Sequence, residues 1–439
     1  MRILITGATG FIGFHLAQRL AAAGHEIVAS ARQADTWRPR LPAWEWRPCD
    51  FMRDTNEEDW APRVADVDLV INAVGIISES HAQGFTPVQT EAPQALFSAC
   101  SRAGVKVLQI SALGAQHPEA VTPFLRSKRL ADDYLWQLPV ECVIAYPAVV
   151  IGQGGQSTAL FCRMAALPIV PLPGDGAQRI NPIHIDDLCA AIAHCVEHWP
   201  GGKRRYLLTG ADTFTVRELY SLLRAWMGLG KARFVNIPPP ILSVVARVAE
   251  RLKPDALLRR NTLQMLCSAA TPAPNFPTAP PRPLAEALWT RPALRADTRE
   301  AVLSGLQPLL VLSIAFVWIF TGLVSLLWNV PAGYALLGNA GINGPLATFF
   351  IHAGGTADLG LGMLMLSGKW RRLAYRLQLG LMLAYMAIIS MMLPSAWLDP
   401  LGPVTKNLPL LGVTALLLML EPYRGRPEDI LPGERRADS

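Results

Sequence analysis

The chain has 439 residues, of which 51% are hydrophobic and only 17% are charged, and its length favours two or three domains. No Asp, Glu, Lys or Arg occurs between Ala301 and Ala357, which excludes a single water-soluble globule, because a charge-free stretch of that length needs a bilayer or a very large core around it. The net charge of +6 is too small and too dispersed to favour binding to nucleic acid.

Short β-branched apolar runs alternate with longer helical patterns from the N-terminus to about Val150. Strands that are buried on both faces and separated by helices are typical of a parallel, doubly wound α/β sheet of the Rossmann type. The predicted strands are Arg2–Thr6, Glu26–Ser30, Leu69–Ala73, Val105–Ile110 and Val140–Ala145. Beyond Val150 the pattern loosens, and two amphipathic helices near Val216–Met227 and Ile241–Leu252 indicate a smaller substrate lobe that completes a cleft.

A glycine-rich turn follows the first strand directly and opens a predicted helix, Phe14–Ala23. In a dinucleotide-binding turn Gly7 makes the tight bend, Gly10 lets the backbone approach a pyrophosphate, and Gly13 lets the helix pack close to the sheet. The helix N-terminus adds unpaired N–H groups and a partial positive charge. The sequence therefore predicts a dinucleotide site here, and its residues are Gly7, Thr9, Gly10, Phe11, Ile12 and Gly13.

The end of the second predicted strand bears on the choice between NAD and NADP. An acidic residue about 20 positions beyond the glycines binds the ribose hydroxyls of NAD, whereas an arginine there accommodates the 2′-phosphate of NADP. Ser30 or Ala31 stands at this position and Arg32 follows. The sequence therefore favours NADP(H), with NAD(H) as the alternative in which Arg32 is an ordinary surface residue.

Further motifs along about the first 270 residues resemble the short-chain dehydrogenase/reductase superfamily in its extended and atypical branch, the NAD(P)-dependent epimerase/dehydratase-like proteins. The matching segments are Cys49–Phe51, Val70–Gly75, Ile110–Ala115, Tyr146–Gly152 and Asn181–Leu188. The fourth-strand and fifth-strand segments are most similar to the group around the nucleotide-binding accessory subunit of respiratory complex I. The resemblance implies that the cofactor also contacts Asp50, Phe51, Ala73, Val74, Gly75, Lys128, Tyr146, Pro147 and Val150.

The chain departs from this superfamily at the catalytic tyrosine. In the family, a tyrosine lies four residues before a lysine, which lowers the pKa of the phenol and binds the nicotinamide ribose. Here Phe124 precedes Lys128, so the lysine is present and the phenol is absent. The position of the family's active-site serine holds Leu113, and Ser111 is a displaced substitute. The resemblance leaves Lys128 and Ser111 as catalytic candidates, with Lys128 either holding the ribose or serving as an ordinary helix lysine.

Three other side chains are candidates for acids, bases or metal ligands. We expect Tyr134 to pack within a helix and Tyr146 to form an aromatic wall beside the nicotinamide. His184 lies close to two aspartates and could suggest a metal site or a base. The resemblance instead implies a structural turn in which Asp187 caps the following helix, so we expect no metal site.

The seven cysteines form no Cys-x-x-Cys pair, and all lie in the N-terminal part of the chain. This usage favours buried thiols in a reducing compartment. The N-terminus reaches its glycine turn too early for the apolar core of a signal peptide. We therefore expect the N-terminal part to stay in the cytoplasm.

The C-terminal part reads as a membrane domain. Residues 271–292 contain seven prolines, which argues against regular structure and indicates a linker. Apolar runs long enough for a hydrocarbon core of about 30 Å follow, with Trp328, Trp370 and Trp397 near their ends. The expected spans are about 308–328, 346–366, 377–397 and 404–420. The expected domains are 1–270 (dinucleotide-binding), 271–300 (linker), 301–423 (transmembrane) and 424–439 (cytoplasmic tail).

Basic residues flank these runs unevenly. They lie before the first span, between the second and third, and after the fourth, while the other two loops contain only Lys406. The positive-inside rule then places both termini in the cytoplasm, with four crossings of a bacterial-type inner (plasma) membrane.

The segment Thr405–Leu411 near the last span resembles the DoxX-like membrane proteins, and the resemblance covers about Ser304 to Tyr423. It implies an association with redox and quinone-linked systems. His352 and Asp358 fall within the second span. A carboxylate at bilayer depth costs about 2.5–3.5 kcal/mol on insertion scales, so it marks either a functional site or a polar contact between helices.

Two functions fit these observations. The first is a membrane-anchored NAD(P)H-dependent oxidoreductase that reduces an apolar acceptor, such as a quinone or a lipid. Its expected partner is a quinone or another membrane redox protein. The second is a non-catalytic NAD(P)H-binding sensor or an assembly scaffold for a membrane redox complex, suggested by Phe124 and Leu113. A third, less supported hypothesis is a transport role for the membrane domain, based on His352 and Asp358.

Overall fold

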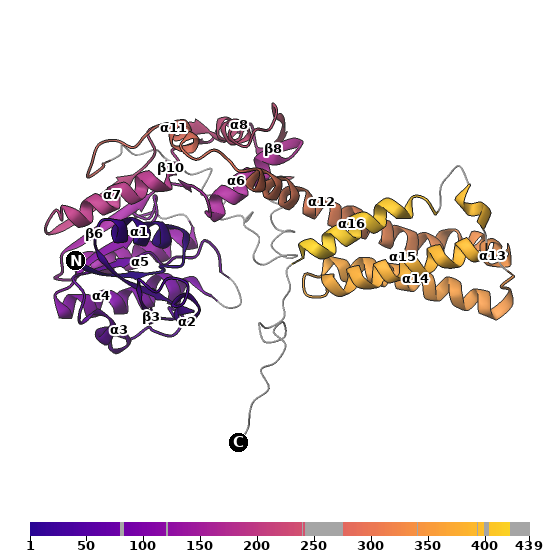
Figure 1. Ribbon diagram of the computed structural model, residues 1–439, viewed down its shortest axis with the longest axis horizontal. Helices are drawn as coiled ribbons and strands as arrows, with labels where there is room; N and C mark the ends of the chain where they lie inside the picture. Colours follow the sequence, from indigo (N-terminus) through magenta and orange to yellow (C-terminus); the bar gives the residue numbers. More distant parts are fainter. Residues whose placement is uncertain are drawn as a thin grey trace, which may run out of the picture. The chain divides into compact units, whose positions relative to one another are not determined.

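The computed structural model divides into two compact units, Met1–Val302 and Leu303–Ser439 (Figure 1). The structure describes residues 1–79, 83–119, 122–238, 240–241, 275–339, 341–392, 394–398 and 404–421. Three predicted segments lie outside the described residues. They are the helix Ile241–Leu252 except for its first residue, the cytoplasmic tail, and most of the turn between the third and fourth spans.

The first unit is built on a parallel sheet of seven strands in the order β11-β6-β5-β4-β1-β2-β3. These strands are β1 (Arg2–Thr6), β2 (Glu26–Ala31), β3 (Glu45–Pro48), β4 (Leu69–Asn72), β5 (Lys106–Ile110), β6 (Cys142–Pro147) and β11 (Lys203–Leu208). The predicted α/β class is confirmed. The chain starts at β1 and builds outward in both directions, so the strand order reverses between β1 and β4, where parallel sheets bind dinucleotides.

Helices cover both faces of this sheet. Along β1 the side chains alternate, so that Ile3 and Ile5 join one buried cluster and Leu4 joins the other. The first cluster includes α1 (Phe11–Ala22) and α7 (Ile185–Glu197), and the second includes α3 (Glu57–Val64), α4 (Ala92–Ala103) and α5 (Pro123–Gln137). Helix α1 begins three residues earlier than predicted, because Gly10 is its N-cap. A short helix, α2 (Ala34–Trp37), links β2 to β3.

The remaining elements of the first unit form the smaller lobe. Its helices are α6 (Gln156–Ala166), α8 (Val216–Trp226) and α11 (Leu284–Trp289). Its strands pair as β7 (Val150–Ile151) with β10 (Ile183–His184), β9 (Arg179–Ile180) with β12 (Phe214–Thr215), and β8 (Ile169–Pro173) with β13 (Arg233–Ile237). The expectation that the prolines exclude regular structure is wrong at α11. Pro283 stands at its N-cap, and Leu284 and Leu288 are buried in the core of the lobe.

The six described cysteines are free and buried, as predicted, while Cys267 lies outside the described residues. Burial raises the pKa of Cys49 to about 11 and that of Cys189 to about 12. These thiols therefore stay protonated at neutral pH, and they behave as small apolar core groups.

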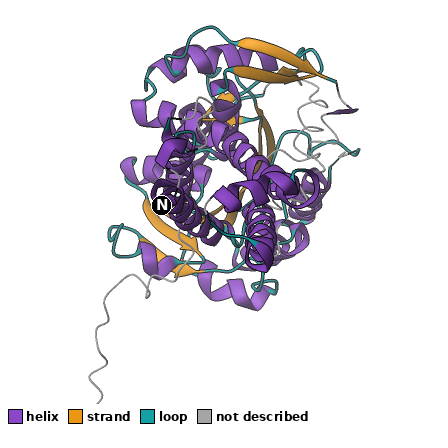
Figure 2. Cartoon of the chain, turned by 90° about the vertical axis from the view of Figure 1, so that its right-hand side faces the viewer, coloured by secondary structure: helices purple, strands orange, loops and turns teal. Residues whose placement is uncertain are grey.

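The described part of the second unit contains helices and no strand (Figure 2). The helices are α12 (Arg295–Leu323), which begins in the first unit, α13 (Val330–Asn339), α14 (Gly344–Leu366), α15 (Arg371–Met392) and α16 (Asn407–Leu420). Three helices are long and apolar enough to cross a membrane, namely Arg295–Trp328, Gly344–Leu366 and Arg371–Met392. Helix α16 is a shorter apolar helix of 14 residues, so a fourth crossing stays a prediction.

Two details of the second unit differ from the predicted spans. Helix α13 was not predicted, and α15 ends at Met392, before the turn Pro394–Trp397 that the third predicted span included. Both His352 and Asp358 lie on α14. His352 is exposed, whereas Asp358 is half-buried and its Oδ1 has no hydrogen-bond partner among the described residues.

Candidate functional site

The residues predicted to bind a dinucleotide follow the carboxyl ends of neighbouring strands. The glycine turn follows β1, Arg32 follows β2, Asp50 follows β3, and Val74 and Gly75 follow β4. Because β4, β1, β2 and β3 are adjacent and parallel, these segments lie along one edge of the sheet. This is the edge at which open α/β sheets bind their ligands.

The glycine turn has the close packing that its sequence predicts. Gly7 has a φ of 71°, and a Cβ on it would lie 3.1 Å from the carbonyl group of Ala73. A Cβ on Gly13 would lie 2.2 Å from the carbonyl oxygen of Gly7, which no side chain can tolerate without moving the helix or the turn. Helix α1 has no side-chain cap and no acidic residue in its first turn, so its first N–H groups remain available to an anion.

A cationic side chain, Arg32, follows the end of β2. The Oγ of Ser30 donates to the carbonyl oxygen of Arg47 at 3.0 Å, and Ser30 is fully buried, so its hydroxyl serves the structure. Arg32 is exposed, and its side chain has no hydrogen bond or ion pair within the part of the chain that is described. Arg32 is therefore free to contact a ligand at this edge.

The carboxylate of Asp50, in the turn after β3, already has partners within the protein. Asp50 Oδ1 accepts from the backbone N–H of Met52 at 3.1 Å, and its carboxylate lies 3.7 Å from Arg53. Phe51 packs edge-on against Trp60, with ring centroids 5.1 Å apart, and only 5% of it is exposed. Asp50 can still accept from a ligand, whereas Phe51 could reach one only through its backbone.

A chain of buried polar side chains crosses the sheet from β1 to α5. Thr6 Oγ1 donates to Asn72 Oδ1 at 2.7 Å, and Asn72 Nδ2 donates to Gln109 Oε1 at 2.8 Å. Gln109 Nε2 then donates to Asp132 Oδ1 at 3.3 Å, and the hydroxyl of Ser111 donates to Asp132 Oδ2. The chain joins β1, β4 and β5 to α5 through groups that are otherwise costly to bury.

Lys128 lies near Asp132, the last member of this network. Its Nζ donates to the carbonyl oxygens of Val74 at 2.9 Å and Ile110 at 3.1 Å, and only 4% of the residue is exposed. These bonds tie the ends of β4 and β5 together and use two of the three ammonium hydrogens. Burial lowers the pKa of Lys128, and the charge of Asp132 opposes that shift.

The surroundings of Gly75 fit a cofactor ribose. A Cβ on Gly75 would lie 3.1 Å from Lys128 Nζ and 3.4 Å from Gln89 Oε1, so glycine keeps this space open. Gln89 donates its Nε2 to Ser127 Oγ at 3.0 Å, but its buried Oε1 has no partner among the described residues. A ribose hydroxyl in this space could donate to Gln89 and accept from Lys128.

The groups in the family's other catalytic positions are apolar. Phe124 packs against Phe85, with ring centroids 6.3 Å apart, and 7% of it is exposed. Leu113 is half-buried, and its backbone N–H donates to the carbonyl oxygen of Pro147 at 2.9 Å. Ser111 is buried and donates to Asp132. Lys128 is therefore the predicted catalytic group that keeps a hydrogen free for a ligand.

The two tyrosines and Val150 have separate surroundings. Tyr146 is 1% exposed, and burial raises the pKa of its phenol. Tyr134 shares a hydrogen bond of 2.7 Å with Ser98, in agreement with a packing role. Val150 is half-buried against the cluster that contains α1. A cofactor contact with Tyr146 or Val150 stays a prediction.

Sequence reasoning missed Asp132, Gln109 and Gln89. Asp132 follows Lys128 by four residues on α5, a spacing that places both side chains on one helix face, and this could have indicated it. The two glutamines carried no such signal. Gln109 reaches Asp132 because α5 packs over β5, and only the fold brings them together.

Replacing Asp132 by asparagine should change how stability depends on pH. Burial raises the pKa of Asp132, with opposing contributions from Ser111 and Lys128. The free energy of unfolding is therefore highest below the ordinary carboxyl pKa of about 4, where Asp132 is protonated in both the folded and the unfolded chain. It falls by up to about 1.4 kcal/mol per pH unit as the pH rises from there toward the raised pKa of the folded state. Thermal unfolding of the full chain in neutral detergent should show this slope in the wild type but not in Asp132→Asn. The matched control is Asp133→Asn, at a half-exposed neighbour, which should keep the slope.

The turn before α7 differs from its prediction. The N-cap is His184, whose Nδ1 accepts from the backbone N–H of Asp186 at 3.3 Å, so Asp187 does not cap the helix. Asp187 instead forms an ion pair with Arg282 at 2.8 Å. Among the described residues, no group of three or more His, Cys, Asp and Glu side chains could hold a metal ion.

The sheet order, the glycine turn after β1 and the uncapped α1 define a Rossmann-type dinucleotide-binding domain. Residues 3–208 match the NAD dependent epimerase/dehydratase family, and residues 315–415 match the DoxX-like family. The chain therefore combines an epimerase/dehydratase-type domain with a DoxX-like domain and associates with membranes.

Individual proteins are similar over about half of the chain. A ceramide reductase of Caulobacter vibrioides is 27% identical over 249 residues, which are 54% of this chain and 74% of that protein. Subunit 9 of the NADH dehydrogenase [ubiquinone] 1 alpha subcomplex of Arabidopsis thaliana is 27% identical over 257 residues, 55% of this chain but only 61% of that protein. The UDP-glucuronic acid 4-epimerase of Bacillus cereus has 20% identity and a TM-score of 0.46 over 54% of this chain and 86% of that one.

Proposed function

We propose that this protein is a membrane-anchored oxidoreductase that uses NAD(P)H to reduce an apolar, quinone-like acceptor. One observation carries the proposal. Lys128 and the open space at Gly75 lie at the carboxyl edge of the sheet. The same chain contains three helices that are long and apolar enough to cross a membrane. A cofactor site joined to a bilayer anchor suits an acceptor that partitions into lipid.

The residues of the site have distinct parts in this reaction. The glycine turn and the first turn of α1 would hold the pyrophosphate, and Lys128 with Gln89 would hold the nicotinamide ribose. The bound nicotinamide would supply a hydride. NAD(P)H, one proton and a quinone then give NAD(P)⁺ and a hydroquinone, so one proton must come from the protein or from water. Lys128, with its lowered pKa, can hold that proton at Nζ without a phenol at position 124.

A second function is favoured by the apolar residues at positions 113 and 124. A protein that binds NAD(P)H without turnover, as a sensor or as a scaffold in a membrane redox complex, needs no proton donor. The similarity to a named subunit of a mitochondrial NADH dehydrogenase supports this alternative.

The two functions are separated by measuring both binding and turnover. The purified full-length chain in neutral detergent is titrated with NADPH by calorimetry and then assayed for NADPH oxidation with a short-chain ubiquinone. Oxidation that depends on the quinone supports the oxidoreductase. Tight binding without oxidation by any lipophilic acceptor supports the sensor or scaffold.

We further propose that the cofactor is NADP(H), because Arg32 is exposed and unpaired where a 2′-phosphate would lie. Arg32→Glu should weaken NADPH binding about tenfold or more and leave NADH binding within about twofold, since one charge-assisted contact is worth roughly 1.5–3 kcal/mol. Calorimetry with both nucleotides measures this preference. The matched control is Arg204→Glu, at an exposed residue on β11 at the opposite edge of the sheet. Equal losses for both nucleotides would assign Arg32 a general electrostatic role.

For the topology, we propose four crossings of a bacterial-type inner membrane with both termini in the cytoplasm, and a boundary between the soluble and membrane parts near residue 300. The basic residues that flank the spans support this orientation. The 14 residues of α16 extend for about 21 Å, less than a hydrocarbon core of about 30 Å, so the crossing also needs flanking residues. To test the four-crossing topology, single cysteines are introduced into each loop of the protein and labelled in intact cells.

A further inference from the structure

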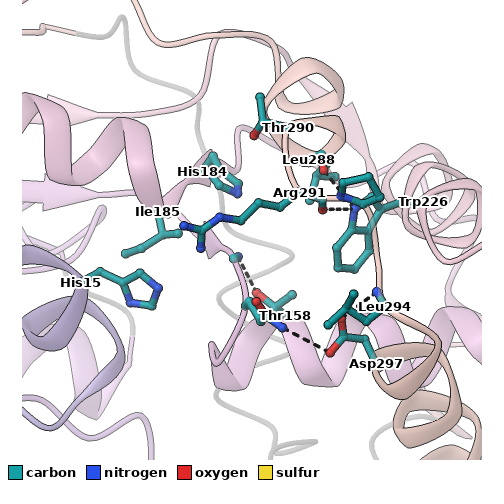
Figure 3. Close-up of a pocket in the computed structure, with 13 residues that line it drawn as sticks. His15, Thr158, His184, Ile185, Trp226, Leu288, Thr290, Arg291, Leu294 and Asp297 are labelled. Atoms are coloured by element: carbon teal, nitrogen blue, oxygen red, sulfur yellow. Dashed lines mark hydrogen bonds between the residues drawn. The ribbon is translucent and has the colours of Figure 1, made fainter. Parts of the chain in front are cut away.

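A pocket lies in the first unit, apart from the residues predicted to bind the dinucleotide. It has a volume of about 350 Å³, and none of the residues predicted to bind the dinucleotide lines it. Its walls come from α1, the start of α6 with the loop before it, the start of α7, the end of α8, α11 with the loop that follows, and the first turn of α12 (Figure 3). The volume falls within the range of small-molecule sites.

The pocket contains a cation without a partner. Figure 3 shows the Arg291 side chain extending across the pocket, with His184 beside it and His15 on the opposite wall. Within the described residues, the guanidinium makes no hydrogen bond and no ion pair. Its backbone is fixed, because Trp226 Nε1 donates to the carbonyl oxygen of Arg291 at 3.0 Å.

The acidic residue that lines the pocket is already used elsewhere. Asp297 Oδ2 accepts from the backbone N–H of Leu294 at 3.0 Å, and its Oδ1 accepts from Gln153 Nε2 at 3.5 Å. It lies more than 4.0 Å from the guanidinium of Arg291, since no ion pair forms between them. Arg291 is exposed and forms no ion pair with a described carboxylate, so its guanidinium is available to a ligand.

Two imidazoles add polar atoms beside this cation. His15 Nδ1 lies 2.8 Å from the carbonyl oxygen of Phe11, and His184 Nδ1 accepts from the backbone N–H of Asp186. Each ring thus uses Nδ1 within the protein, which leaves Nε2 as the atom available to a ligand. The remaining walls combine the polar residues Gln153, Thr158 and Thr290 with an apolar part that includes Ile185, Leu288 and Leu294.

We propose that this pocket binds a phosphate group carried on an apolar body. A guanidinium pairs with two phosphate oxygens at once. Because His184 Nδ1 accepts within the protein, its Nε2–H can donate to a third oxygen, and because His15 Nδ1 donates within the protein, its Nε2 can accept from a protonated phosphate oxygen. The apolar walls then cover the attached hydrocarbon. The phosphate could belong to a phospholipid headgroup or to a soluble phosphate ester. This site is independent of the proposed hydride transfer, and its test does not use NADPH.

The test is calorimetry of the full-length chain in neutral detergent with three phosphate probes, namely inorganic phosphate, hexyl phosphate and dihexanoyl phosphatidic acid, and with hexanol as the control that lacks a phosphate. We expect the two amphiphilic probes to bind more tightly than inorganic phosphate. Arg291→Gln should weaken their binding about tenfold or more, and His15→Asn should weaken it to a smaller extent. The matched control is Arg295→Gln, at an exposed arginine that does not line the pocket and that should keep wild-type binding.

The outcomes are distinct. Tighter binding of dihexanoyl phosphatidic acid than of hexyl phosphate identifies a lipid source, and the reverse identifies a soluble ester; both support the proposal. Circular dichroism of each variant confirms that it is folded. Hexanol binding as tightly as hexyl phosphate, no binding of any phosphate probe, or equal binding by wild type and folded Arg291→Gln would overturn it.

Discussion

Replacing Gly13 by alanine is expected to abolish binding of the nicotinamide dinucleotide. The added Cβ would lie 2.2 Å from the carbonyl oxygen of Gly7 and 2.9 Å from its carbonyl carbon, and both belong to backbone that cannot rotate away. Either α1 must move off the turn or the turn must open, and each change misplaces the N–H groups that would hold the pyrophosphate. We expect the Kd for NADPH to rise at least about 100-fold, which corresponds to about 2.7 kcal/mol.

This prediction is measured by calorimetry of the full chain with NADPH. The matched control is Gly230→Ala, because a Cβ on Gly230 meets no atom within 4 Å and the residue lies in the same unit. The control should bind NADPH as the wild type does. Binding by Gly13→Ala within about threefold of the wild type would show that the dinucleotide is not held by this turn.

Replacing Lys128 by methionine is expected to remove most of the turnover. Methionine keeps the length and the burial of the side chain, but it leaves the carbonyl oxygens of Val74 and Ile110 without their donor and takes away the charge beside Asp132. A positioned acid or base contributes typically 10²- to 10⁴-fold to a rate, so we expect kcat to fall by at least about 100-fold. NADPH binding should weaken to a smaller extent, because the glycine turn is unchanged.

The readout for Lys128→Met separates catalysis from folding. Steady-state oxidation of NADPH by a short-chain quinone gives kcat and KM, and circular dichroism reports the fold. The matched control is Lys106→Met, at a partly exposed lysine at the start of β5 that lies 3.9 Å from Glu141 and should leave kcat unchanged. An unchanged kcat in folded Lys128→Met would remove this residue from the mechanism.

The sheet could be predicted because its strands are buried on both faces. Such strands give short β-branched runs, and the runs at β1, β2, β4 and β5 agree with the structure to within one residue at each end. Helix α11 could not be predicted, because the prolines around it dominate the local pattern. It forms because Leu284 and Leu288 are buried against the lobe, which is a tertiary effect.

Part of the site could be predicted from a local sequence motif, and part depends on contacts between residues that are far apart in the sequence. The glycine turn is a contiguous motif, so its conformation could be read from the sequence. The polar chain that ends at Asp132 joins residues 66, 37 and 23 positions apart. These residues meet only through the register of β1, β4 and β5 and the packing of α5, which no local pattern encodes. For the same reason, the sequence indicated Ser111 as a catalytic candidate but did not reveal that its hydroxyl donates to Asp132.

A single-turnover experiment tests the central proposal most directly. The full-length chain is loaded with NADPH in neutral detergent and mixed rapidly with a short-chain ubiquinone, while the absorbance of the reduced nicotinamide is followed. We predict that the signal of bound NADPH decays with the quinone present, and that it decays more slowly when the transferable hydrogen is replaced by deuterium. Bound NADPH that stays reduced with every lipophilic acceptor would contradict the proposed oxidoreductase.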